Sequence, residues 1–154
     1  MVHRKDKGKP DDRLIFLLGH ARHRVYLRLD QALLDRAGVT TAQVGALFFL
    51  RGHDGCLLSQ MGKGLMLDKS AITGLVDRLE KKRMIERRRD PADRRAIRLH
   101  LTRRGRDVTA KALPVVKEQN DAIKEGFSAE EIEVFSRVLR AVIERSGGTP
   151  RGES

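Results

Sequence analysis

Cysteine and aromatic residues are scarce in this sequence of 154 residues: Cys56 is the single cysteine, tryptophan is absent, and aromatics make up 4%. One cysteine excludes an intramolecular disulfide framework and agrees with a reducing compartment. No apolar run is long enough for a membrane-spanning helix, and the run at 14–18 is too short for a signal-peptide core. We therefore expect a cytoplasmic protein without a membrane partner.

The sequence also lacks the motifs that carry catalysis or bind metal. It has no Gly-rich phosphate loop, no His-Glu-x-x-His helix and no Cys-x-x-Cys pair, and its five histidines are scattered. His20 and His23 are three residues apart on an expected helix, but no obvious carboxylate accompanies them. The sequence predicts no enzyme, no metal site and no cofactor.

Cys56 allows two interpretations. It follows Asp54 and Gly55 at an expected helix start, where amide dipoles would lower the pKa of its thiol and favour the thiolate. The alternative, which we favour, is a small, half-buried hydrophobic residue.

Positive charge is abundant. Lys and Arg number 32 against 21 Asp and Glu, a formal net charge of +11 that is spread along the chain. Such a balance predicts a polyanionic partner, and nucleic acid is favoured over a membrane surface. Residues 1–12 are charged and rich in Lys, Gly and Pro, so we expect a mobile basic arm there.

The most informative stretch, residues 67–102, begins with a helix. Asp68 is a suitable N-cap, and Leu67 and Ile72 are spaced as a hydrophobic staple. The apolar stripe of this helix consists of Ile72, Leu75, Val76 and Leu79. Its other side carries hydrogen-bonding and charged residues: Lys69, Ser70, Thr73, Gly74, Asp77, Arg78 and Lys81. That side either enters a DNA major groove or is an ordinary solvated face.

Beyond Arg83 the pattern changes from helical to alternating. Ile85 and Arg87 belong to a first expected strand, and Ile97, Leu99 and Leu101 to a second, from which Arg98 and His100 point outward. The loop between the strands is basic and contains a Pro turn. A capped helix followed by a basic ribbon predicts a winged helix, with the helix in a major groove and the ribbon reaching a minor groove.

The remaining chain is expected to be helical. A long helix over 13–35 ends at Gly38, a capping box at Thr40 opens a second helix with Leu47, Phe48 and Leu50 inside, and a weak third helix covers 58–65. The third helix and the Asp68 helix would form a helix-turn-helix.

After the ribbon, Thr102 caps a helix to about 125 that Pro114 bends, and a capping box at Ser128 opens the last helix. The apolar stripes of the terminal helices form a dimer interface or pack within one chain, and the pattern allows both.

The stretch resembles the winged helix of the multiple-antibiotic-resistance regulator (MarR) family of bacterial transcription factors. The resemblance rests on residues 68–73, on Leu79-Glu80 before the first strand, and on 93–95 leading to Leu101-Thr102. It implies that Asp93 braces the ribbon through an ion pair and that Arg95 enters a minor groove. Two positions depart from the pattern: Gly74, where many members have Arg, and Arg83, where Gly is usual. The first puts base specificity in doubt, and the second costs on the order of 1 kcal/mol if the helix ends in a left-handed conformation.

The resemblance also implies a mainly α fold with a small β-hairpin. It implies that the terminal helices form a dimer interface and do not simply pack within one chain. The expected division is an arm at 1–12, a dimerisation helix at 13–38, a winged helix-turn-helix at 39–101, dimerisation helices at 102–146 and a flexible tail at 147–154. The implied function is a homodimeric, sequence-specific repressor of a palindromic operator in double-stranded DNA, relieved by a small aromatic or anionic ligand. The alternative is a nonspecific architectural nucleic-acid-binding protein.

Two sets of site residues follow. The candidate DNA-binding residues are Ser59, Lys69, Ser70, Thr73, Gly74, Asp77, Arg78, Lys81, Arg88, Asp93, Arg94 and Arg95. The candidate ligand-binding residues are His20, Arg24 and Phe48, of which Arg24 would pair with a carboxylate or phenolate.

Overall fold

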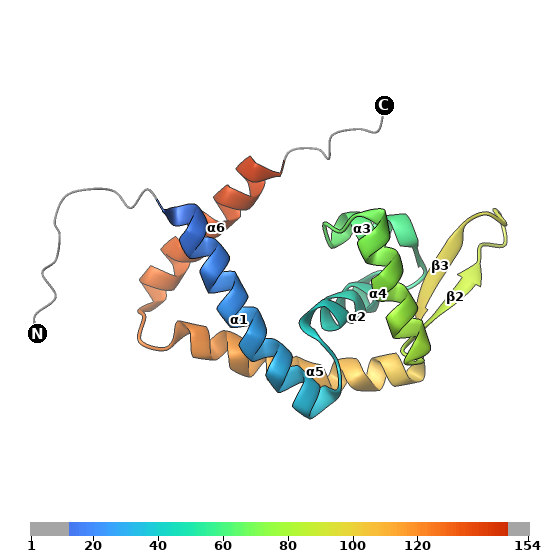
Figure 1. Cartoon of the computed structure of the whole chain (residues 1–154), viewed down its shortest axis with the longest axis horizontal. Helices are drawn as coiled ribbons and strands as arrows, with labels where there is room; N and C mark the ends of the chain where they lie inside the picture. The colour runs from blue at the N-terminus through green and yellow to red at the C-terminus, as the bar shows by residue number, and fades with distance from the viewer. Residues whose placement is uncertain (1–12, 148–154) are drawn as a thin grey trace, which may run out of the picture. The chain divides into compact units, whose positions relative to one another are not determined.

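The computed structural model describes residues 13–147, so the expected arm at 1–12 and the expected tail beyond Gly147 lie outside the described residues. The chain divides into two compact units, Met1–Lys117 and Glu118–Ser154. Figure 1 shows the order of the helices and strands along the chain. Within residues 13–147, no helix is both long and apolar enough to cross a membrane.

In the first unit, α1 (Leu14–Ala37) covers the first expected helix and ends as expected at Gly38, whose φ of 69° is left-handed. Its C-terminal end joins the core, where Leu33 is fully buried and Leu29 packs against its neighbours. The N-terminal half is different, because the apolar residues at 14–18 are all exposed within the single chain. The expected stripe is therefore only partly covered by this chain.

The second helix, α2 (Thr41–Gly52), begins with the expected capping box. The Gln43 N–H donates to Thr40 Oγ1 at 3.2 Å, and the Thr40 N–H donates to Gln43 Oε1 at 3.1 Å. Val39 and Val44 are both buried beside this start, as a hydrophobic staple requires. Helix α2 is the centre of the unit, because five of its residues are buried.

The helix-turn-helix consists of α3 (Leu58–Gly64) and α4 (Lys69–Lys81). The turn between them contains Met66 at φ 54°, and the Leu67 N–H donates to the Gly62 carbonyl at 2.9 Å. The expected apolar stripe of α4 is confirmed, since Ile72, Leu75, Val76 and Leu79 are all buried.

The β-structure is larger than the expected hairpin. Strands β2 (Ile85–Arg89) and β3 (Ile97–Leu101) pair antiparallel with Ile85 opposite Leu101 and Arg88 opposite Arg98. A third strand, β1 (Cys56–Leu57), pairs with the other edge of β3, so the order is β1-β3-β2. We call residues 85–101, the two strands and their loop, the wing. Figure 1 shows the wing beside α4, in agreement with the contacts between α4 and β2.

Helix α5 (Arg103–Lys124) follows the wing and is capped by Thr102 as expected, with the Gly105 N–H donating to Thr102 Oγ1 at 3.0 Å. A Cβ atom on Gly105 would lie 2.0 Å from the Met84 carbonyl oxygen, so only glycine allows this approach. Pro114 lies inside the helix. The N-terminal part of α5 thereby closes the core of the first unit, where Ala112 and Val115 are fully buried.

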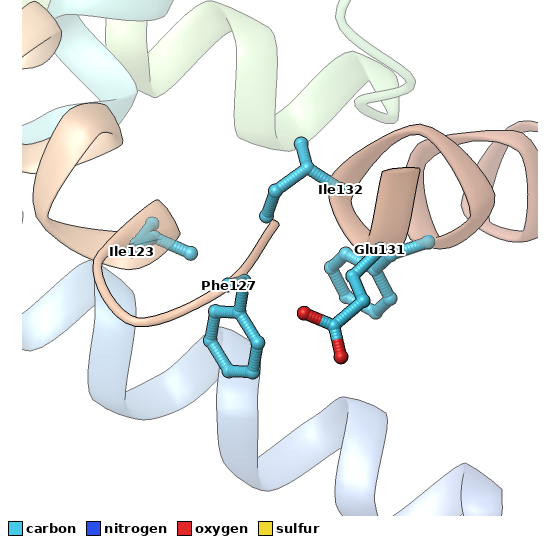
Figure 2. A pocket seen from close by; sticks show the side chains of 5 residues that line it. Ile123, Phe127, Glu131 and Ile132 are labelled. Atoms are coloured by element: carbon cyan, nitrogen blue, oxygen red, sulfur yellow. The ribbon is translucent and has the colours of Figure 1, made fainter. Parts of the chain in front are cut away.

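The second unit contains the end of α5 and the last helix, α6 (Ala129–Ser146). The Ser128–Glu131 capping box is present, yet no residue of α6 is buried. Figure 2 shows Ile123, Phe127 and Ile132 around an apolar cavity of about 450 Å³, with the Glu131 carboxylate at its edge. The apolar stripe of α6 is thus left largely uncovered within one chain.

Candidate nucleic-acid interface

The N-terminal end of α4 is held by its cap and exposes polar groups. The Ala71 N–H donates to Asp68 Oδ1 at 2.7 Å, which confirms Asp68 as the N-cap. Lys69 and Ser70, in the first turn, are exposed. The remaining amides of the first turn make this end favourable for an anion such as a DNA phosphate.

Thr73 has a defined hydrogen-bonding role. Its hydroxyl donates to the Lys69 carbonyl at 2.7 Å, so the proton is used within the helix and the oxygen lone pairs are left as acceptors. An acceptor of this kind suits the exocyclic amines of adenine or cytosine in a major groove. Next to it, Gly74 leaves room for Arg78, because a Cβ atom on Gly74 would lie 3.3 Å from an Arg78 guanidinium nitrogen.

Asp77 is engaged within the protein. Arg87 of β2 donates to Asp77 Oδ1 at 2.5 Å and also pairs with Glu80, so both carboxylates of α4 hold one arginine of the wing. The hydrogen bond to Asp77 raises the pKa of Arg87, with Glu80 adding to the effect. Arg87 therefore joins the wing to α4, and its charge is compensated before any DNA arrives. Neither Arg87 nor Glu80 was among the expected site residues, because their partners are seven to ten positions away.

The loop of the wing is braced differently from the expectation. Among the described residues Asp93 makes no ion pair; its Oδ1 accepts the Arg95 N–H at 2.9 Å and closes a local turn. The ion pair in this region joins Asp90 and Arg98, with 2.7 Å between Asp90 Oδ2 and the guanidinium. The expected ion pair of Asp93 was wrong, because its carboxylate accepts the Arg95 N–H within the turn itself.

The tip of the wing carries exposed charge. Arg94 and Arg95 are exposed, and Arg88 is exposed beside Glu86, with which it pairs. The other expected DNA-binding residues also lie on the surface, Ser59 on α3 and Lys81 at the end of α4. The structure thus brings the expected residues onto α3, α4 and the wing, which lie in one unit.

Arg98 and His100 point away from the core face of β3, but neither is simply solvated. Both are half-buried beneath the segment that precedes β1, and His100 Nδ1 lies 3.2 Å from Asp54 Oδ2. Burial opposes ionisation of Asp54, but the Leu101 N–H, at 2.7 Å, and His100 outweigh it, so the pKa of Asp54 is lowered. Asp54 therefore remains a carboxylate that ties the α2–β1 connection to β3.

Cys56 lies in β1 and is buried. Burial raises the pKa of its thiol, so the thiolate interpretation was wrong and the hydrophobic one is confirmed.

The expected ligand residues lie on two helices of the first unit. His20 and Arg24 are exposed on α1, and Phe48 is half-buried on α2, against the core. A cavity of about 260 Å³ in this unit has a different lining: Arg51, Leu101, Arg106, Thr109, Ala110 and Leu113.

A helix-turn-helix followed by a basic, braced wing defines a winged-helix DNA-binding protein. Residues 37–96 match the sequence model of the MarR family. The organic hydroperoxide resistance transcriptional regulator of Bacillus subtilis is 31% identical over 115 residues, covering 75% of this chain and 78% of that protein. The chain belongs to the MarR family. It is a transcriptional regulator and not an enzyme.

Solved structures agree with this assignment. A probable transcriptional regulator from Pseudomonas aeruginosa is 29% identical with a TM-score of 0.77, covering 86% of this chain and 98% of that one. BpsR of Bordetella bronchiseptica is 26% identical with a TM-score of 0.69, covering 82% and 98%. The latter structure concerns the regulation of BpsR DNA binding by 6-hydroxynicotinic acid.

Proposed function

We propose that the protein is a homodimeric, sequence-specific repressor that binds a palindromic operator in the cytoplasm and releases it when a small aromatic or anionic ligand binds. In this proposal residues 39–101 read the DNA, while 13–38 and 102–146 supply the dimer interface. Each subunit places α4 in a major groove and the tip of its wing in a flanking minor groove.

The observation that carries the proposal is the pairing of two surfaces within one unit. The outer side of α4 presents Lys69, Ser70 and the acceptor oxygen of Thr73, and the wing beside it presents Arg94 and Arg95. The first set is suited to base edges and nearby phosphates, and the second to the negative potential of a narrow minor groove. Because Arg87 holds the wing to α4, the two surfaces keep a fixed separation, which sequence-specific binding needs.

Dimerisation is supported by the apolar surface left open on both units. On α1, Leu14, Ile15 and Phe16 are 64%, 81% and 67% exposed, and on α6, Val134, Phe135 and Val138 are about half exposed. Apolar patches on this scale are rare on monomers and mark interfaces. A symmetric dimer of winged helices reads a palindrome, since its two-fold axis is repeated in the DNA.

The ligand proposal rests on the family. For BpsR, 26% identical to this chain, regulation of DNA binding by 6-hydroxynicotinic acid is the subject of the solved structure. We propose an analogous small aromatic or anionic effector here, with His20, Arg24 and Phe48 as lining residues. A guanidinium such as that of Arg24 pairs well with a carboxylate.

The test compares two substitutions in DNA binding. DNA fragments retained by the purified protein are sequenced first, to define the operator. Thr73→Ala should then relax the preference at one operator position by roughly 1–3 kcal/mol, because a base contact is lost. Arg95→Ala should lower affinity for all sequences and reduce the slope of log K against log salt by about 0.9, the value for one neutralised phosphate.

Arg140→Ala is the matched control, since it removes one exposed positive charge from α6 and should leave both readouts unchanged. If the retained fragments share no sequence, and both substitutions weaken operator and scrambled DNA equally, the protein is a nonspecific architectural binder instead.

A further inference from the structure

Arg98, on β3, connects three parts of the first unit. Its Nε and one terminal nitrogen both lie 2.7 Å from Asp90 Oδ2, and its other terminal nitrogen donates to the Gly55 carbonyl at 2.8 Å. Asp90 begins the loop of the wing, whereas Gly55 lies before β1. One side chain therefore links the wing loop to the connection between α2 and α3.

Asp90 is a suitable anchor for this link. Its side chain is only 12% exposed, its Oδ1 accepts the Ala92 N–H at 2.9 Å, and its own N–H donates to the Ala96 carbonyl at 3.0 Å. The Ala92 N–H and then Arg98 lower the pKa of Asp90, so it is a carboxylate at neutral pH. The same residue thus shapes the turn and binds Arg98.

Gly55 is equally fixed at the other end. Its φ of 82° is left-handed, and its N–H donates to the Leu99 carbonyl at 2.8 Å, which places its carbonyl beside β3. A Cβ atom there would lie 3.1 Å from the His100 ring, so the backbone is packed closely onto the strand. Arg98 therefore binds a carbonyl that cannot move independently of the sheet.

The two faces of the wing are held by different arginines. Arg98 lies opposite Arg88 in the strand register, and Arg87 lies opposite the buried Leu99, so Arg87 and Arg98 point to opposite faces. Arg87 is bound by the α4 carboxylates and Arg98 by Asp90 and Gly55. Of the arginines near the tip, Arg94 and Arg95 are exposed and available to DNA.

We propose that Arg98 is a positioning residue for DNA binding: it fixes the wing so that Arg94 and Arg95 reach the minor groove, and it is not itself a phosphate contact. This inference rests on the proposed function for its DNA readouts. An ordinary exposed ion pair contributes little, but this one involves a nearly buried carboxylate and a third bond to a rigid carbonyl.

Asp90→Asn distinguishes a positioning role of Arg98 from a direct contact between Arg98 and DNA, because the two roles predict opposite changes in operator affinity. Asparagine keeps an acceptor for the Ala92 N–H but loses the charge that binds Arg98. If the charge of Arg98 acts directly on DNA, removing a nearby negative charge strengthens binding. If Arg98 positions the wing, Asp90→Asn weakens operator binding about tenfold, as expected when an arginine contact at the tip is lost.

Arg98→Lys provides the second variant, because lysine keeps the positive charge but cannot bind two partners as a fork. A positioning role predicts that Arg98→Lys weakens binding like Asp90→Asn and lowers the salt slope by more than about 0.9, since several tip contacts are lost together. Arg89→Lys is the matched control on the neighbouring strand, because Arg89 is exposed, keeps its positive charge in this substitution and is not a candidate DNA-binding residue; it should bind like the wild type.

A double-mutant cycle completes the test. In the Arg98→Lys background, Arg95→Ala should have little further effect, because a displaced tip no longer delivers Arg95. Additive losses, wild-type binding by Arg98→Lys, or tighter binding by Asp90→Asn would each overturn the proposal.

Hydrogen exchange in the free protein separates this proposal from the proposed function. Both variants should accelerate exchange of the amides at 90–96 while the amides of α4 keep wild-type protection, which also shows that the unit is folded. Unchanged exchange in the wing would refute the positioning role even if the wild type bound no specific operator. If both variants exchange faster in the wing but the wild type shows no sequence-specific binding, the positioning role of Arg98 is supported and only the proposed function is contradicted.

Discussion

At the scale of single residues, Arg83 has an unusual backbone conformation. It follows α4 with a φ of 57°, a left-handed value that side chains other than glycine adopt at a cost. The turn is held from both sides, because the Arg83 N–H donates to the Glu80 carbonyl at 2.8 Å and its own carbonyl accepts the Thr102 hydroxyl at 2.7 Å. The left-handed conformation was predicted from the sequence, because the family usually has glycine at the position of Arg83.

Arg83→Gly should therefore stabilise the protein. Relief of a left-handed side chain is worth about 1–2 kcal/mol, and the added freedom of the unfolded chain costs about 0.5–1 kcal/mol, so we expect a net gain of roughly 0.5–1 kcal/mol. Urea unfolding of the purified protein measures the change.

Arg78→Gly is the control, because it removes the same exposed side chain from an interior position of α4 and should destabilise by about 1 kcal/mol. Equal destabilisation by both substitutions would show that the conformation at 83 carries no strain.

Single residues also show what sequence patterns leave out. The basic character of 87–95 was evident from the sequence, which predicted Arg88, Arg94 and Arg95 as DNA-binding residues but gave no role to Arg87. In the structure Arg87 is bound by Asp77 and Glu80, whereas Arg95 is exposed. Which arginine is free depends on carboxylates brought close by folding, and no local rule predicts that.

At the scale of helices and strands, capped elements were predicted well. Asp68, Thr40 and Ser128 each accept an amide three residues ahead, so the signal for each helix start lies within four positions. Strand β1 was missed because it has only two residues and exists through its pairing with Leu99 and Arg98, more than forty positions away. A strand of that length has no alternation of its own to detect.

Helix α6 leads to a prediction about assembly. None of its residues is buried, and Val138 in its apolar stripe is 49% exposed. Val138→Glu should convert the proposed dimer into a monomer, because a carboxylate would be buried unpaired in the interface. Light scattering should then give the 17.4 kDa of one chain in place of twice that mass.

Ser146→Glu, which adds the same charge at the exposed end of α6, should leave the mass unchanged. A Val138→Glu protein that stayed dimeric would exclude α6 from the interface. Deleting residues 1–34 is a less selective test, because it also removes Leu33 from the core of the first unit.

At the scale of the whole molecule, the proposed ligand links DNA binding to stability. A ligand that binds the DNA-free state better than the operator-bound state must stabilise the protein and weaken operator binding together. At a ligand concentration about 100 times Kd the stabilisation is about 2.7 kcal/mol. We expect at least one member of a panel of aromatic acids to raise the Tm and lower operator affinity in parallel.

Arg24→Ala should abolish both effects, and Arg28→Ala, one turn further along α1, should abolish neither. Indifference of the wild-type protein to the whole panel would favour a regulator without a ligand.

The net charge of +11 predicted a polyanionic partner for the whole molecule, but charge alone does not distinguish operator from random DNA. That distinction depends on the spacing between α4 and the wing, and on the spacing between the two subunits of the proposed dimer, which the order of residues does not reveal.

Cys56, the single cysteine of the chain, is buried in β1, and burial raises the pKa of its thiol. Thiol-directed dyes react with exposed thiolates, so they leave such a side chain largely unmodified. The native protein should consequently take up very little label. A cysteine introduced at an exposed position would carry a fluorophore or spin label selectively, and movements of the wing could be followed in solution without altering β1.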